Sequence, residues 1–313
     1  MKAALVTGGA GFIGSHLVHA LAGRGVPVRV LDNLSTGNRA NLEGTPAEVI
    51  VGDVTDPAAV AAAAEGAEVV FHLAAMISVP ESMVDPVRCY RENVQGSLHV
   101  LEAARRVGAR RVVLSSSCAV YGAADHPSGE TDDLQPGSPY AASKIAMEHL
   151  GRLYSGVYGL STVSLRYFNV YGPRQSPTSP YAAVIPAFAR ALLDRRAPII
   201  HGDGQQSRDF VYVADVVQAN LLAAEAGEPV PAVVNVGTGH AVTIRRLAVL
   251  LAEVLPGAPA ATFAPPRAGD LHASCSDPRL AWEALGFRPA HDLQRGLSHT
   301  VEWMRGEKVA PSG

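Results

Sequence analysis

Residues 7–14 read Thr7-Gly8-Gly9-Ala10-Gly11-Phe12-Ile13-Gly14, which places glycines at positions 8, 11 and 14. The run follows a short apolar stretch and precedes an Ala- and Leu-rich one, so we expect it to join a strand to a helix. A glycine in the tight turn permits unusual dihedral angles, another lets the backbone approach a pyrophosphate, and Gly14 allows close helix–strand contact. The helix N-terminus adds free N–H donors. The spacing indicates a dinucleotide-binding turn, although a glycine-rich turn without a ligand is an alternative for the motif alone.

The first 117 residues alternate short β-branched runs with longer Ala- and Leu-rich stretches, the pattern of βαβ units. Strands are predicted at Ala3–Thr7, Val28–Leu31, Glu48–Val51, Val69–Leu73 and Arg111–Ser115, and helices at Phe12–Gly23, Pro57–Ala64, Glu92–Val107 and Tyr140–Tyr158. The strands are apolar throughout, as in a parallel sheet that is covered on both faces. We therefore expect an α/β protein with a Rossmann-type, doubly wound parallel sheet.

The sequence changes character after Ser161. Five prolines between residues 173 and 198 break the chain into short pieces, and a Gly- and Pro-rich C-terminal third follows. Residues 208–224 nevertheless resemble a strand followed by a helix, and residues 233–236 resemble another strand. We therefore expect an interleaved boundary between a first domain, residues 1–166 plus about 210–235, and a smaller C-terminal α/β lobe, residues 167–209 and 236–313.

Composition excludes several classes of protein. The 313-residue chain is 48% hydrophobic and 18% charged, which is typical of a globular protein. Its formal net charge of -3 offers no broad positive field, so we expect no nucleic acid and no membrane as partner. No stretch approaches the ~20 uncharged residues of a membrane span, and no signal peptide is expected. The three cysteines lack metal-ligand spacing and cannot all pair, which favours reduced thiols in the cytoplasm and no metal site.

An acidic residue at the end of the second predicted strand bears on the choice of cofactor. Asp32 lies 18 residues after Gly14, close to the ~20 expected for the acid that binds a ribose 2′-hydroxyl. A carboxylate there would repel a 2′-phosphate, so NAD fits better than NADP. Arg39 is the nearby basic candidate and is expected on a solvated surface. Asp53 follows the third strand. It could contact the adenine of the cofactor or begin a turn, and both interpretations are equally supported.

Tyr140-Ala-Ala-Ser-Lys144 lies on a predicted helix, and Ser115-Ser116-Ser117 stands at the end of a predicted strand. Spacing of four residues puts the phenol and the ammonium on one helix face. We expect the cation to lower the pKa of the phenol from ~10 toward neutrality and so to create a base. A Tyr–Lys pair alone is usually a surface pair. Together with the dinucleotide motif it indicates proton abstraction coupled to hydride transfer.

These motifs belong to a longer series of blocks. The series comprises Thr7–Gly14, Leu31–Gly37, Gly52–Val54, His72–Ala75, Glu92–Gly96, Ser115–Gly122, Tyr140–Lys144, Leu165–Asn169, Gly202–Asp215 and Asn235–Gly239. In this order, and over essentially the whole chain, the sequence resembles the extended short-chain dehydrogenase/reductase family, in its branch that acts on nucleotide sugars.

The resemblance implies a site with NAD as cofactor. Tyr140 would be the base, Lys144 would bridge to the nicotinamide ribose, and Ser117 would be the strand-end hydroxyl, with Ser116 as the alternative. The implied cofactor-binding residues are Gly8, Gly11, Phe12, Ile13, Gly14, Asp32, Asn33, Ser35, Thr36, Gly37, Asp53, Val54, Leu73, Ala74, Ala75, Asn93, Ser115, Tyr140, Lys144 and Phe168. The apolar members of this set are alternatively packing residues.

The resemblance also implies a nucleotide-diphosphate sugar as partner, bound by the smaller lobe. The implied substrate-binding residues are Ser117, Tyr140, Asn169, Ile199, Ile200, His201, Arg208, Arg267, Asp270 and Ser274. Arginine suits a diphosphate because its planar donors bind two oxygens at once. Ser274 stands where relatives limit the space beside the sugar 2-substituent, so its small size favours acceptance of N-acetylated hexoses. Relatives commonly form homodimers through two helices, here residues 93–107 and 140–158, and a homodimer is expected.

The residues after the strand-end hydroxyl narrow the reaction. Related 4,6-dehydratases carry Asp-Glu there and related decarboxylases keep an acid, whereas this chain has Cys118 and Ala119. A packing role for Cys118 is favoured over a nucleophilic one. The expected reaction is 4-epimerisation of a nucleotide hexose, UDP-glucose or UDP-galactose and their N-acetyl forms, through a 4-keto sugar. A UDP-glucuronate 4-epimerase, another nucleotide-sugar oxidoreductase or dehydratase, and a non-catalytic NAD-sensing module stay open as alternatives.

Overall fold

The computed structural model describes residues 1–177, 183–266 and 271–306. The strands are β1 (Ala4–Thr7), β2 (Val28–Asp32), β3 (Glu48–Val51), β4 (Val69–His72), β5 (Arg111–Ser117), β6 (Ser161–Tyr167), β7 (Asn169–Tyr171), β8 (Ile199–His201), β9 (Ser207–Tyr212), β10 (Val233–Val236), β11 (Ala241–Thr243), β12 (Thr262–Ala264) and β13 (Ala273–Ser274). The α-helices are α1 (Phe12–Gly23), α2 (Pro57–Ala64), α3 (Val79–Val84), α4 (Pro86–Tyr90), α5 (Gly96–Arg106), α6 (Pro139–Tyr158), α7 (Val184–Leu193), α8 (Val213–Glu225), α9 (Ile244–Val254), α10 (Arg279–Leu285) and α11 (Leu293–Gly306). Two 3-10 helices, η1 (Arg39–Leu42) and η3 (Cys118–Val120), and one π-helical turn, η2 (Arg91–Gln95), complete the described elements.

The large sheet is parallel and doubly wound. Its seven strands follow the order β10-β6-β5-β4-β1-β2-β3, and every neighbouring pair is parallel. The order reverses between β1 and β4, where two successive crossovers leave in opposite directions. A crevice forms at such a switch point beyond the carboxyl ends of the strands. The predicted fold class is therefore confirmed.

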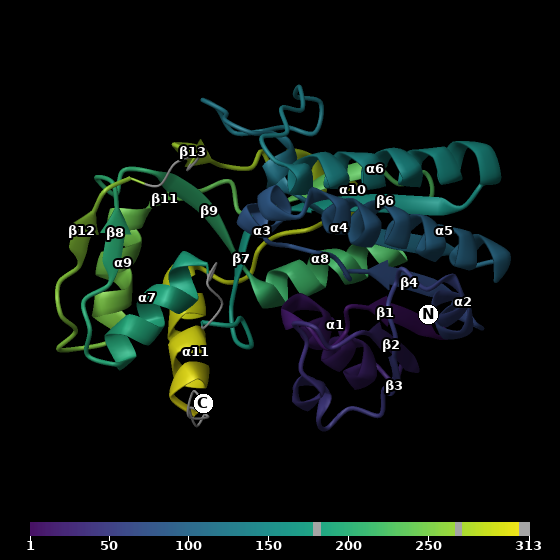
Figure 1. Ribbon diagram of the computed structural model, residues 1–313, viewed down its shortest axis with the longest axis horizontal. Helices are drawn as coiled ribbons and strands as arrows, with labels where there is room; N and C mark the ends of the chain where they lie inside the picture. Colours follow the sequence, from purple (N-terminus) through teal and green to yellow (C-terminus); the bar gives the residue numbers. More distant parts are fainter. Residues whose placement is uncertain (178–182, 267–270, 307–313) are drawn as a thin grey trace.

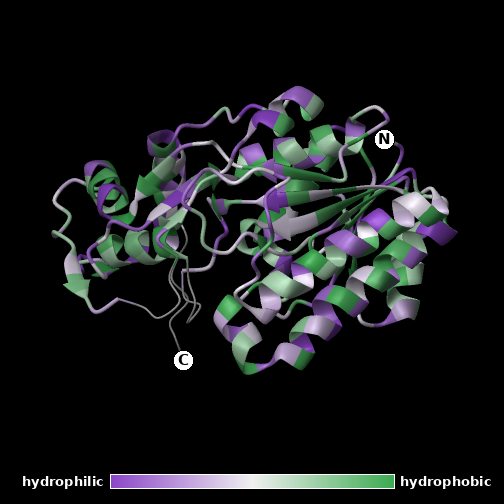
Figure 2. Ribbon diagram, turned by 90° about the horizontal axis from the view of Figure 1, so that it is seen from above, coloured by the Kyte–Doolittle hydropathy of each residue, from purple (hydrophilic) through white to green (hydrophobic). Residues whose placement is uncertain are grey.

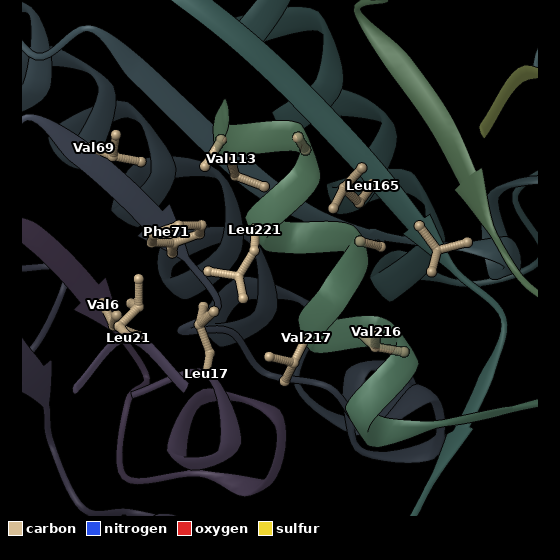
Figure 3. Close-up of a cluster of buried hydrophobic side chains, with 14 of the residues drawn as sticks. Val6, Leu17, Leu21, Val69, Phe71, Val113, Leu165, Val216, Val217 and Leu221 are labelled. Carbon is tan, nitrogen blue, oxygen red and sulfur yellow. The ribbon is translucent and has the colours of Figure 1, made fainter. Parts of the chain in front are cut away.

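Helices cover both faces of this sheet, which explains its uniformly apolar strands. Helices α1, α8 and α10 pack on one face, and α2, α5 and α6 pack on the other. Figure 3 shows part of the first core, where Leu221 of α8 points toward Phe71 of β4 and lies near Leu17 and Leu21 of α1. Hydrophobic residues dominate the strands in Figure 2, whereas the outer helices carry mixed surfaces. Burial of these apolar side chains is the main favourable contribution to folding.

A second group of elements lies to the left of the large sheet in Figure 1. It contains a four-stranded sheet, in which β9 pairs with β7, β11 and β13, and the two-stranded sheet β8–β12. Helices α7, α9 and α11 pack together beside these strands. The strand and helix expected over residues 208–224 are present as β9 and α8, and β10 then rejoins the large sheet beside β6.

Most predicted boundaries agree with the structure to within one or two residues, but the prediction of one regular helix at residues 92–107 is wrong. The chain there forms α4, the π-helical turn η2 and then α5. Within the turn, the Asn93 amide bonds the backbone of Met76 and the hydroxyl of Ser143, while Ser97 donates to the Asn93 carbonyl. Such insertions of one residue into a helix often occur at functional sites.

Among the helices in residues 1–177, 183–266 and 271–306, none combines the length and the apolar character of a membrane-spanning segment.

His72, at the end of β4, connects the sheet to α5. Its Nδ1 lies 2.7 Å from Thr7 Oγ1 and its Nε2 lies 2.9 Å from Ser97 Oγ. The ring is buried, and this burial, helped by the positive charge of Lys144, lowers its pKa to about 3. His72 is therefore neutral in the folded protein at every pH above that value.

We predict that His72 makes folding stability fall with acid. Its folded pKa lies below the unfolded value of about 6.5, so between these values the unfolded chain binds a proton that the folded chain does not. Stability is thus retained above pH 6.5 and lost as the pH falls toward 3, at up to about 1.4 kcal/mol per pH unit for this proton. Urea unfolding of the unaltered protein and of His72→Gln, at several pH values between 7 and 5, measures how the free energy of unfolding depends on pH. An equal pH slope in both proteins would contradict the prediction.

Candidate functional site

The glycine-rich turn joins β1 to α1 with very close backbone contacts. Gly8 has a φ of +70°, and a Cβ there would lie 2.7 Å from the backbone nitrogen of Ala74. A Cβ on Gly14 would lie 2.1 Å from the Gly8 carbonyl oxygen. Side chains are therefore excluded at both positions, and the N-terminus of α1 is open to an anionic group.

A cavity of about 290 Å³ opens beside this turn at the carboxyl ends of the strands. Its wall includes most residues of the predicted cofactor set: Gly8, Gly11, Phe12, Ile13, Gly14, Asp32, Asn33, Ser35, Thr36, Asp53, Val54, Leu73, Ala74, Ala75, Ser115, Tyr140, Lys144 and Phe168. The structure thus brings together residues that are distributed over 160 positions of the sequence. A glycine cradle, a helix N-terminus and a carboxylate at the end of β2 fit a dinucleotide.

Two residues of the predicted cofactor set do not line the cavity. Asn93 is buried, and its amide bonds Met76 and Ser143 behind the wall. Gly37 packs closely against Ala10 and the carboxylate of Asp32. Internal hydrogen bonds and packing place both residues behind the cavity wall, and their contact with the cofactor stays a prediction.

The two predicted acidic residues of the cofactor site are held by backbone donors. Asp32 accepts hydrogen bonds from the backbone N–H groups of Ala10 at 2.9 Å and of Leu34 at 2.8 Å. Asp53 accepts from the Asn33 side chain and the Thr55 backbone, both at 2.8 Å. Asp53 therefore both begins a turn and lines the cavity, so the two interpretations of this residue are compatible. Arg39 is exposed, as expected.

Ser117, Tyr140 and Lys144 meet at the same cavity. Helix α6 is fixed at its start by Pro139 and by Ser138, which accepts from the Ala141 N–H, so Tyr140 and Lys144 lie on its first turns. The Ser117 side chain lies close enough to the Tyr140 hydroxyl to act on its pKa as a hydrogen-bonding group. Lys144 Nζ donates to the Ser115 carbonyl oxygen at 2.8 Å.

The neighbouring Ser116 has a different environment. Its hydroxyl donates to Glu148 Oε1 at 2.6 Å, about two turns along α6 from Tyr140. Glu148 also accepts two hydrogen bonds from Arg166, at 2.9 and 2.7 Å, and both side chains are almost fully buried. This ion pair, which the sequence analysis did not predict, fixes α6 to β6. Ser117, not Ser116, is thus the strand-end hydroxyl within reach of the phenol.

The expected acidic phenol is not found in this structure. Burial raises the pKa of Tyr140 to about 12, against the opposing effect of the hydrogen bond from Ser117. Burial also lowers the pKa of Lys144 to about 8. The ammonium lies 5.8 Å from the centre of the Tyr140 ring and bonds a carbonyl, so it does not offset the loss of solvent around the hydroxyl. The prediction that Lys144 lowers the phenol pKa is therefore wrong for this arrangement of side chains.

A second cavity, of about 510 Å³, adjoins the small sheets. Four predicted substrate-binding residues line it: Asn169, Ile199, His201 and Arg208. The Ile200 side chain points the other way into the apolar core, since neighbours on a strand alternate sides, and its contact with the substrate stays a prediction. Val170 and Gln175 line both cavities, which therefore lie next to each other. They follow the block Leu165–Asn169 directly, which was the one signal that could have identified them.

The remaining predicted substrate residues lie on or near β13. Ser274 pairs with Arg208 across the β9–β13 register, and its hydroxyl is 3.8 Å from the Cys118 sulfur. Ser274 therefore lies between Cys118, which follows β5, and β9, whose Arg208 lines the second cavity. Arg267 and Asp270 lie outside the described residues.

The turn, the crevice and the Ser–Tyr–Lys set together define a dinucleotide-dependent enzyme of the short-chain dehydrogenase type. The chain belongs to the NAD dependent epimerase/dehydratase family, whose model matches residues 4–237. This confirms the resemblance found in the sequence and NAD as the cofactor.

Three solved structures are similar over nearly the whole chain. A UDP-N-acetylglucosamine 4-epimerase from Methanobrevibacter ruminantium, in complex with UDP-N-acetylmuramic acid, is 40% identical with a TM-score of 0.93, covering 97% of this chain and 98% of that one. A UDP-glucose 4-epimerase from Thermotoga maritima with UDP-glucose is 40% identical with a TM-score of 0.92, covering 97% and 99%. A UDP-glucose 4-epimerase from Thermus thermophilus in complex with NAD is 41% identical with a TM-score of 0.89, covering 98% and 99%.

The glycine contacts give a test of the cofactor cradle. We predict that Gly14→Ala abolishes retention of NAD, because the new methyl group would overlap the Gly8 carbonyl and displace α1 from the turn. NAD content of the purified protein, measured after denaturation, checks this.

Gly23→Ala is the matched control, since it lies at the end of the same helix and a Cβ there meets nothing within 4 Å. It should keep the NAD content of the unaltered protein. Normal NAD content in Gly14→Ala would show that the close contact is not required.

Proposed function

We propose that the protein is a nucleotide-sugar 4-epimerase that interconverts the C4 epimers of a UDP-hexose. The observation that carries the proposal is the convergence of Ser117, Tyr140 and Lys144 on a dinucleotide cavity that shares two wall residues, Val170 and Gln175, with a second cavity lined by Arg208. The full-length similarity to enzymes named UDP-glucose and UDP-N-acetylglucosamine 4-epimerase supports the choice of reaction.

Each residue of the catalytic set has a distinct role in this proposal. Tyr140 exchanges a proton with the C4 hydroxyl of the sugar, and Ser117 hydrogen-bonds the same oxygen and orients it. Lys144, held by the Ser115 carbonyl, supplies positive charge beside the phenol. When bound, NAD supplies a nicotinamide that accepts a hydride from C4 and returns it to the opposite face of the rotated 4-keto sugar, and its oxidised form carries a positive charge that favours phenolate. Cofactor and enzyme end each cycle unchanged.

The residues after Ser117 argue against the other reactions of the family. Burial raises the pKa of the Cys118 thiol to about 11, so this group is protonated and cannot replace a carboxylate. Ala119 packs against the apolar cluster of Met76, Cys89 and Tyr140. Dehydration needs an additional acid and base, and neither residue provides one.

The two cavities support the predicted division of the chain into lobes. We assign NAD to the part formed by residues 1–166 and about 210–235, and the nucleotide sugar to residues 167–209 and 236–313. The Arg208 guanidinium is the diphosphate-binding group among the described residues of the second cavity, with Asn169, Ile199 and His201 around it.

A homodimer is part of the proposal. Leu98 of α5 and Leu153 and Val157 of α6 have exposed side chains, although each lies on a helix of the large sheet. Exposed apolar residues on adjacent helices are typical of a protein–protein interface. A cytoplasmic location is supported by the three free cysteines.

We predict that Tyr140→Phe lowers kcat by about 10²–10⁴-fold, the range for loss of a general base, while NAD content is unchanged. Conversion of UDP-galactose to UDP-glucose without added NAD measures this. Tyr154→Phe is the matched control, since it removes a hydroxyl from another buried tyrosine of α6 that contacts Glu102 at 3.3 Å. Near-normal turnover in Tyr140→Phe would assign the base to another residue.

We further predict turnover of UDP-N-acetylglucosamine, because Ser274 is small. In Ser274→Tyr the added ring would occupy the space proposed for the N-acetyl group, so turnover of the acetylated sugar should fall by at least about tenfold while UDP-glucose is still converted. Product separation for both sugars, in the unaltered protein and the variant, provides the measurement. Absence of acetylated product from the unaltered protein would refute the prediction.

A further inference from the structure

Strand β9 is the element around which the proposed substrate residues are arranged. Arg208 lies on it, Ser274 pairs with Arg208 from β13, and Asn169 of β7 pairs with Phe210. The Asn169 side-chain amide also donates to the backbone carbonyl of Asp209 at 3.2 Å. The positions of all three groups therefore depend on how β9 is held by its neighbours.

The Asp209 carboxylate, next to Arg208, is fully buried and accepts hydrogen bonds from three further residues. Oδ1 accepts from the Thr238 hydroxyl at 2.5 Å and from the Thr238 N–H at 2.9 Å. Oδ2 accepts from the Gly239 N–H at 3.0 Å and from the N–H and hydroxyl of Ser276 at 3.1 and 2.5 Å. None of these donors is charged, so the carboxylate is stabilised by directed dipoles alone.

These hydrogen bonds join three segments that are distant in sequence. Thr238 and Gly239 form the turn after β10 of the large sheet, while Ser276 follows β13, the strand of Ser274. The segments meet closely: a Cβ on Gly237 would lie 2.4 Å from the Ser276 hydroxyl oxygen and 2.7 Å from Asp209 Oδ2. The carboxylate thus fixes β9 and β13 to the edge of the large sheet at one point.

We propose that Asp209 is a positioning residue for nucleotide-sugar binding, which holds Arg208 and Ser274 in place from behind the cavity. The inference rests on the proposed function in that it takes Arg208 as a diphosphate ligand. Asp209 does not line either cavity, so it acts on the substrate only through these neighbours. Its loss should therefore weaken binding of the nucleotide and leave the proton and hydride transfers largely intact.

An amide cannot replace this carboxylate. In Asp209→Asn, one oxygen is exchanged for an NH₂ group, which would face backbone N–H donors where they now have an acceptor. Buried donors without an acceptor are costly, so β13 and the 237–239 turn should move away from β9. Ser276→Ala and Thr238→Val are milder variants, because each removes one hydroxyl donor and keeps the backbone N–H.

The test measures nucleoside-diphosphate affinity by calorimetry, with UDP, dTDP and GDP as probes, together with kcat, KM and NAD content. We expect Asp209→Asn to weaken the tightest-binding probe by at least about tenfold and to raise KM in parallel, with kcat within about twofold. Ser276→Ala and Thr238→Val should each weaken binding by about threefold or more, and they decide the outcome if Asp209→Asn does not fold.

Asp215→Asn is the matched control. Asp215 is also buried and accepts hydrogen bonds from the backbone N–H groups of Ala290 and His291, but it contacts none of the proposed substrate residues. It should lower the unfolding temperature and leave nucleotide affinity within about twofold. Equal loss of affinity in Asp215→Asn, or unchanged affinity in the Asp209, Ser276 and Thr238 variants, would overturn the inference.

The same measurements distinguish failure of the proposed function from failure of the inference about Asp209. If the unaltered protein binds a nucleoside diphosphate but converts no sugar, the epimerase proposal fails while the affinities still decide the role of Asp209. If it binds none of the three probes, both proposals are wrong.

Discussion

The approach of the Ser117 side chain to the Tyr140 hydroxyl is the contact on which the proposed chemistry depends. It joins the first turn of α6 to the last residue of β5, at the base of the cofactor cavity. The same burial that keeps water from this hydroxyl raises its pKa to about 12, which opposes ionisation. A dry site favours hydride transfer but disfavours a charged base, and Lys144, which bonds the Ser115 carbonyl one turn along the helix, does not by itself offset this burial. Positive charge from the bound cofactor completes the balance in our account.

The packing of α6 against β5 and β6 of the large sheet places these groups. Tyr140, Lys144 and Glu148 recur every four residues along α6 and face β5 and β6. Tyr140 and Lys144 line the cofactor cavity. Glu148 forms the buried ion pair with Arg166 that fixes the helix. Breaking such a pair by removing one partner leaves an uncompensated buried charge. The rigid packing of α6 against the sheet is therefore as much a part of the site as the groups that touch the substrate.

Local patterns in the sequence were sufficient for the large sheet and for much of the cofactor cavity. The Gly8–Gly14 spacing, the acid at Asp32 and the Tyr140–Lys144 pair act through short-range geometry, so the sequence alone predicts them. Other features depend on contacts between distant segments. The π-helical turn holds Asn93, which bonds the distant residues Met76 and Ser143, and the phenol pKa follows from burial by several elements. Asp209 stood within a recognised block, but only the structure brings residues 238, 239 and 276 to its carboxylate.

The central claim is that the hydrogen that C4 of the sugar loses as a hydride on oxidation is the same one that returns to C4 on reduction. Conversion of UDP-galactose carrying deuterium at C4, in ordinary water and without added NAD, tests it most directly when the product is analysed by NMR. Our account predicts UDP-glucose that retains the deuterium at C4, because the hydride is returned from the cofactor and does not exchange with solvent. Product with ordinary hydrogen at C4 would contradict the account, since it would require removal of C4–H as a proton.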